Sequence, residues 1–246
     1  MKNLVVMLLF ALTTSSFTQT AKEVIAKSDK VLRGNSSKSE MTIQIVRPSW
    51  EREMTLKSWS KGDDLSVVLI TGPAKDKGTV FLKRHKEVWN WVPAIERTIK
   101  LPPSMMSQSW MGTDFTNDDL VNEFSIVEDY THSFQGEEII EGRTCWIIDM
   151  VPKPDAAVVW GKVRVWVDQK DYLQLKVENY DEDEYLINSM LASDIKNMGG
   201  RMMASKLVMI PEDEPGNKTI MIYKDIVFDV AIDDDFFSTN NMKRLQ

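Results

Sequence analysis

Short segments in which apolar and polar residues alternate recur along this chain after residue 40, and they limit its fold more than any other feature. In the first of them, Met41, Ile43 and Ile45 alternate with Thr42 and Gln44. The later segments with strand character lie at 54–57, 65–70, 79–82, 88–92, 145–150, 163–168, 173–177, 186–191, 202–209, 219–223 and 226–230. A period of two places successive side chains on opposite faces of a strand. Short strands at this spacing, without a linker rich in Gly, Ser or Pro, predict one domain built on a strongly curved, barrel-like antiparallel sheet.

A helix is expected ahead of these strands, over residues 21–32. Its apolar residues recur at three- and four-residue spacing, as Val24, Ile25 and Val31 illustrate, so they share one face of a helix. Gly34 follows, and glycine tolerates the left-handed backbone that often ends a helix. We therefore expect an N-terminal helix with one apolar face.

One segment, residues 101–124, interrupts the strand pattern in the middle of the chain. Pro102 and Pro103 exclude a central strand that continues through them. Met105, Met106, Ser109 and Trp110 follow at helical spacing. Asn117-Asp118-Asp119 can cap a second short helix. An antiparallel sheet with one solvated face needs a cover over its other face. The large apolar side chains of this segment are expected to supply that cover.

The first twenty residues have the pattern of a cleaved secretory signal. Lys2 precedes an apolar run at 4–12 and a polar stretch at 13–19. An apolar core of this length is too short to cross a bilayer, which takes about 20 helical residues. We expect a signal peptide at 1–19 and a single domain at 20–246, exported in soluble form to the periplasm without a lipid anchor. A buried N-terminal helix is the alternative.

The charge and the reactive side chains of the sequence exclude several classes of function. Thirty Lys and Arg against 37 Asp and Glu give a net charge of −7, which disfavours a nucleic-acid partner. One cysteine, Cys145, and two histidines, His85 and His132, leave little from which to build a metal or catalytic centre. We expect no enzymatic activity, no cofactor and no metal, and a hydrolase is only a remote alternative.

Two groups of charged residues have both a structural and a functional interpretation. Asp114, Asp118 and Asp119 are interpreted as capping residues, with acid–base or metal chemistry as the alternative. The basic run at 83–86 is typical of an exposed turn, with contact to an anionic head group as the alternative. We favour the structural interpretation of both groups.

Five segments carry a resemblance to a known family. The sequence WMGTDFTNDDL at 110–120 resembles the central motif of the outer-membrane lipoprotein-sorting (LolA-like) family. The similarity extends over 165–177, 195–201, 218–220 and 234–237. The resemblance implies an open antiparallel half-barrel of about eleven strands, mainly β, with N-terminal and mid-chain helices over its concave apolar face. The better-known members of this family carry the acyl chains of lipoproteins across the periplasm.

The candidate contacts with an acyl chain are Trp59, Trp89, Trp91, Met105, Met106, Trp110, Met111, Phe115 and Trp166. The chain also has 15 methionines, whose flexible side chains adapt to irregular ligands. Burial of an acyl chain gains about 0.8 kcal/mol per CH₂, so one long chain offers roughly 10 kcal/mol. Ordinary core packing is the alternative for each of the nine residues.

The resemblance implies a monomeric periplasmic carrier of lipids or lipoproteins. Its partners would be an inner-membrane transporter that supplies the acyl chains and an outer-membrane acceptor that receives them. We expect no covalent chemistry, because cargo would enter and leave as the covering helices open. The alternative keeps the fold and makes the protein a lipid-responsive regulator or adaptor that docks on a membrane transporter or signalling complex.

Overall fold

The computed structural model describes residues 19–245, apart from 86, 122–125 and 157. The predicted signal peptide at 1–19 lies outside the described residues, except for Gln19. Among the described residues, no helix is both long enough and apolar enough to cross a membrane.

Thirteen strands make up most of the described chain. They are β1 (Ser36–Arg47), β2 (Trp50–Lys61), β3 (Leu65–Gly72), β4 (Val80–Arg84), β5 (Glu87–Val92), β6 (Arg97–Lys100), β7 (Tyr130–Ile140), β8 (Arg143–Pro152), β9 (Lys162–Asp168), β10 (Gln174–Tyr180), β11 (Leu186–Met198), β12 (Arg201–Pro211) and β13 (Lys218–Phe228). The helices are α1 (Ala21–Arg33), η1 (Pro93–Ile95), η2 (Pro103–Met105), α2 (Asn117–Val121), η3 (Asp234–Phe236) and α3 (Thr239–Met242).

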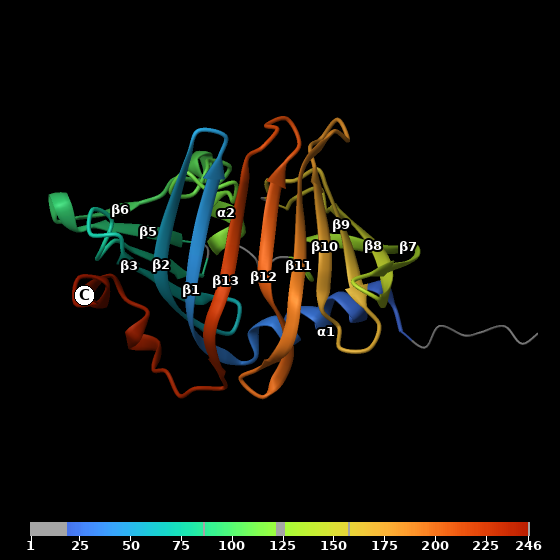
Figure 1. Cartoon of the computed structure of the whole chain (residues 1–246). Helices are drawn as coiled ribbons and strands as arrows, with labels where there is room; N and C mark the ends of the chain where they lie inside the picture. The colour runs from blue at the N-terminus through green and yellow to red at the C-terminus, as the bar shows by residue number, and fades with distance from the viewer. Residues whose placement is uncertain (1–18, 86, 122–125, 157, 246) are drawn as a thin grey trace, which may run out of the picture.

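All the strands belong to one open antiparallel sheet. Its order is β6-β5-β4-β3-β2-β1-β13-β12-β11-β10-β9-β8-β7, so β6 and β7 form its two edges (Figure 1). The pairing of β1 with β13, in which Ile43 lies opposite Met221, joins the first and last strands of the chain. The predicted fold class, an open half-barrel that is mainly β, is confirmed.

The edge strands were missed by the sequence analysis, and the implied count of about eleven strands is too low for the described residues. β6 has only four residues, and nearly every residue of β7 between its ends is partly or fully exposed. An edge strand buries little, so it lacks the apolar alternation by which inner strands are recognised. In addition, the segments 219–223 and 226–230 belong together, because β13 runs from Lys218 to Phe228.

The predicted N-terminal helix is confirmed as α1. Thr20 accepts a hydrogen bond from the Glu23 N–H, while the Glu23 carboxylate accepts one from the Thr20 N–H, which completes a capping box. Gly34, with φ of 67°, ends the helix. The apolar face of α1, including Val24 and Ile25, packs against the concave face of β7–β10.

The chain crosses from one edge of the sheet to the other between β6 and β7, and we call residues 101–129 the crossover. Its helix α2 lies on the same side of the sheet as α1, behind the long central strands in the view of Figure 1. Thr116 caps α2, since its hydroxyl accepts from the Asp119 N–H while the Asp119 carboxylate accepts from the Thr116 N–H. The cap therefore begins one residue before the predicted Asn117.

The C-terminal segment covers the opposite, outer face of β2–β5. Phe237 and Met242 are fully buried there against Leu65, Val67 and Leu82. Both faces of this part of the sheet are therefore buried, the outer one by residues that follow the last strand.

Candidate functional site

A solid apolar cluster fills part of the concave face. Its buried members, which we call the Trp110 cluster, are Met41, Ile43, Ile45, Met54, Leu56, Ile70, Phe81, Trp110, Phe115, Met209 and Met221. The crossover supplies Trp110 and Phe115, and the strands supply the others. The Trp110 ring lies 5.4 Å from that of Phe81 and is 1% exposed. This part of the crossover is therefore a core element.

Hydrogen bonds and an ion pair fix the same part of the crossover to the sheet. The carboxylate of Asp114 accepts two hydrogen bonds from the guanidinium of Arg47, at 2.9 and 3.1 Å. It also accepts from the hydroxyl of Thr219 at 2.7 Å, and that hydroxyl in turn accepts from the Asp114 N–H. Arg52 donates to the carbonyl of Met111. We call these contacts the Asp114 clasp.

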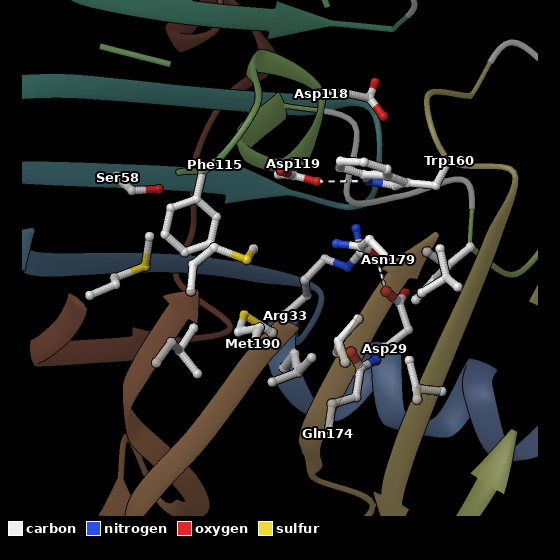
Figure 2. Close-up of a pocket in the computed structure, with 18 of the residues that line it drawn as sticks. Asp29, Arg33, Ser58, Phe115, Asp118, Asp119, Trp160, Gln174, Asn179 and Met190 are labelled. Atoms are coloured by element: carbon white, nitrogen blue, oxygen red, sulfur yellow. Dashed lines mark hydrogen bonds and ion pairs between the residues drawn. The ribbon is translucent and has the colours of Figure 1, made fainter. Parts of the chain in front are cut away.

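Next to this cluster the concave face is hollow. A cavity of about 220 Å³ lies between α1, the crossover and the sheet (Figure 2). Its apolar walls come from Leu32, Met41, Leu56, Val68, Phe115, Ile126, Met150, Val163, Val165, Val177, Met190, Leu207, Met209 and Met221. Five of these side chains are methionines. The cavity shares Met41, Leu56, Phe115, Met209 and Met221 with the Trp110 cluster, so the two regions adjoin.

Polar side chains gather in the cavity beside these apolar walls. Asp29 and Arg33, one turn apart on α1, form an ion pair. The indole N–H of Trp160 donates to the carboxylate of Asp119 at 3.3 Å (Figure 2). Asp118 also lines the cavity. A ligand of the cavity would thus meet both hydrocarbon and charged groups.

Burial and neighbouring charges shift several pKa values around the cavity. Burial raises the pKa of the Asp119 carboxyl, against the opposing effect of hydrogen bonds from Thr116 and Trp160. Burial and the positive charge of Arg33 lower the pKa of Lys83 to about 8, while Asp64, Asp63 and Asp118 oppose that shift. Because the Lys83 side chain is buried, the prediction of an exposed basic turn is wrong for this residue.

The structure separates the nine candidate residues. Phe115 lines the cavity. Trp110 and Met111 belong to the Trp110 cluster or pack against it. Met105 ends η2, Met106 follows it, and both are half-buried.

The four strand tryptophans lie on the outer face, away from the cavity. Trp59, Trp89 and Trp91 pack in the cluster that the C-terminal segment covers. Trp166 lies between the inward-facing Val165 and Val167, and its indole N–H donates to Glu138. Their contact with a ligand stays a prediction, and their position favours core packing.

Most of the residues that line the cavity were not predicted from the sequence. Asp29, Arg33, Trp160, Gln174 and Asn179 line it and were not candidates. The parity of β10 was a usable signal, because Val177 and Asn179 necessarily share a face. No such signal connects α1 to Trp160, which lies in a loop. No group of three or more metal-binding side chains occurs among the described residues.

Comparison with known proteins shows which family this chain belongs to. A family model whose description reads "-like: Uncharacterized protein" matches residues 62–244, well over half of the chain. The chain belongs to this family. No curated protein gives a significant match.

Several solved structures have a fold similar to that of this chain. A DUF1329 family protein from Desulfovibrio piger has a TM-score of 0.83 and 22% identity, covering 90% of this chain and 97% of that one. A putative outer membrane lipoprotein-sorting protein domain from Vibrio parahaemolyticus has a TM-score of 0.81 and 22% identity, covering 91% and 98%. A LolA superfamily protein from Nitrosomonas europaea has a TM-score of 0.78 and 23% identity, covering 91% and 99%. The chain therefore has the LolA-like fold, as the sequence motifs predicted.

Proposed function

We propose that this protein is a periplasmic carrier that binds acyl chains of lipids or lipoproteins and moves them from the inner to the outer membrane. The observation that carries the proposal is the cavity on the concave face of a LolA-like sheet, lined by residues of α1, the crossover and the strands. The secretory pattern of the first twenty residues supports export. An inner-membrane donor and an outer-membrane acceptor would complete the route.

The walls of the cavity suit hydrocarbon. Methionine side chains are flexible and polarizable, and Met41, Met150, Met190, Met209 and Met221 line the space. Each CH₂ group moved from water into such surroundings gains about 0.8 kcal/mol. Ligand pockets commonly measure about 300–1,000 Å³, so a cavity of about 220 Å³ must widen to take a long chain. Capture and release then follow movement of the covering helices, without covalent chemistry.

Uptake of a fluorescent, uncharged fatty-acid ester tests the proposal. Delipidated protein is titrated with the methyl ester of cis-parinaric acid, and we expect a saturable rise in fluorescence. Trp110→Asp should weaken uptake, because it places a charge in the fully buried cluster beside the cavity. Tyr185→Asp, at a side chain that is 70% exposed, is the control. Circular dichroism shows whether each variant is folded, and wild-type protein without saturable uptake would contradict the proposal.

Transfer between membranes separates a carrier from a lipid-responsive adaptor. Donor vesicles with a labelled acyl lipid are mixed with unlabelled acceptor vesicles, with and without the protein. A carrier accelerates transfer in proportion to its concentration. Uptake of lipid without any acceleration of transfer would reject the carrier and favour the adaptor.

A further inference from the structure

The volume of the cavity limits how many chains it can hold. A cavity of about 150 Å³ accepts one benzene ring, so about 220 Å³ holds roughly nine carbon atoms. One chain of sixteen carbons needs roughly twice that space on the same scale, and two such chains need roughly four times as much. Room for one chain of sixteen carbons requires movement of the flexible methionine side chains. Room for two such chains requires that the segments covering the sheet be arranged differently.

The neighbouring Trp110 cluster cannot easily move aside to give the additional volume that a long acyl chain needs. Its indole and the ring of Phe115 belong to a segment that the Asp114 clasp fixes to β1 and β13. The Arg47 and Asp114 side chains are only 13% and 6% exposed. Separating a largely buried ion pair leaves two unpaired charges, which strongly opposes such a movement. The cavity can therefore expand only on the side that α1 covers.

The charges around the cavity disfavour an anionic head group. Three carboxylates, those of Asp29, Asp118 and Asp119, line it together with one cation, Arg33. Arg33 already forms an ion pair with Asp29, and the ammonium of Lys83 donates to the carbonyl of Asp63. Another anion would meet a site in which acidic groups already outnumber basic ones, and a buried charge without a partner is costly.

We propose that the cavity takes one acyl chain at a time, from an amphiphile with an uncharged head group such as a monoacylglycerol. This inference rests on the proposed carrier function and names its ligand class. It excludes cargo whose two chains enter the cavity together.

Native mass spectrometry tests both parts of the inference. The delipidated protein is incubated with phosphatidylcholine vesicles that contain equal amounts of monopalmitoylglycerol, dipalmitoylglycerol and palmitic acid at pH 7.5. We expect one monopalmitoylglycerol per protein, at least ten-fold more abundant than either other adduct. Dipalmitoylglycerol bound equally well would overturn the single chain, and a dominant palmitate adduct would overturn the uncharged head group. If no acyl lipid binds here and the methyl ester of cis-parinaric acid does not bind either, the carrier function itself fails.

Matched variants place the bound chain in the cavity. Val177→Phe narrows the cavity and should reduce the monopalmitoylglycerol adduct at least ten-fold, whereas Val227→Phe, at a side chain 46% exposed outside the cavity, should not. Met190→Phe is a second narrowing variant in case the first does not fold. Unchanged binding in a folded narrowing variant would overturn the assignment.

A charge variant tests the head group separately. Asp118→Asn removes one of the three carboxylates and should raise the palmitate adduct several-fold relative to that of monopalmitoylglycerol. Asp155→Asn, at an exposed residue, is the control. A palmitate adduct that Asp118→Asn does not raise would contradict the electrostatic part of the proposal.

Discussion

The Trp110 cluster and the cavity lie side by side on one concave face, yet one is solid and the other is hollow. In the cluster, the crossover inserts an indole that is 1% exposed and is tied down by the Asp114 clasp. Over the cavity, α1 contributes Asp29 and Arg33, and the strands contribute flexible methionines. The comparison teaches that the sheet alone does not decide which part of its concave face stays hollow. The covering segments decide which part of its face is filled.

The largest effect is expected in the Trp110 cluster. Trp110→Ala should lower the free energy of unfolding by about 4 kcal/mol, because it leaves a large void in a packed core. Urea denaturation followed by circular dichroism measures this loss. Trp50→Ala, at a side chain 49% exposed, should cost far less. Similar losses for the two variants would remove the distinction between core and surface on which the comparison depends.

The Asp114 clasp should show the next largest effect. Asp114→Ala leaves the guanidinium of Arg47 largely buried without its carboxylate, so we expect a loss of about 3 kcal/mol in urea denaturation. The double variant Arg47→Met, Asp114→Leu removes both charges and should be less destabilised than the sum of the two single variants. A loss below about 1 kcal/mol for Asp114→Ala would mean that the clasp does not hold the crossover.

Two identical substitutions compare the regions directly. Met54→Ala, in the Trp110 cluster and with no exposed surface, should cost about 3 kcal/mol. Met190→Ala, at a half-buried residue that lines the cavity, should cost about 1 kcal/mol, because it enlarges a space that already exists. Urea denaturation of both variants gives the difference. Equal losses would show that the cavity is as tightly packed as its neighbour.

A smaller, pH-dependent effect is expected at Lys83. Burial lowers its pKa to about 8 from the ordinary value of 10.5. Between these values the unfolded chain holds a proton that the folded chain has lost, so the free energy of unfolding rises with pH in this window. Relative to Lys83→Met, the wild type should gain on the order of 1 kcal/mol between pH 8 and pH 10. Lys100→Met, at an exposed residue, is the control, and a constant difference across the window would contradict the buried position of the ammonium.

The inner strands were predictable from the sequence, but which of their faces is concave was not. Alternation places Trp59 on the face opposite Leu56, and it places Trp89 and Trp91 together. It does not say which face is inward, because both faces of β2–β5 are buried. Phe237 and Met242, more than 140 positions after these strands, cover the outer face. A contact so distant in the chain leaves no local periodicity by which it can be predicted.

The candidate site was predictable only where local sequence and topology agreed. The motif at 110–120 identified the fold and placed Trp110 in a buried cover over the sheet. It did not distinguish a side chain that fills the concave face from one that borders a hollow. That distinction depends on how α1 and Trp160 meet across the sheet, and their positions are set by packing between distant segments.

Photo-crosslinking with an acyl chain that carries a diazirine tests the central claim most directly. The labelled lipid is bound to delipidated protein, irradiated, and its attachment points are located by mass spectrometry of peptides. We expect attachment to residues that line the cavity below α1, such as Met150, Val177 and Met190. Attachment confined to the outer face, at Trp59, Trp89 or Trp91, or no attachment above that of a denatured control, would contradict the account.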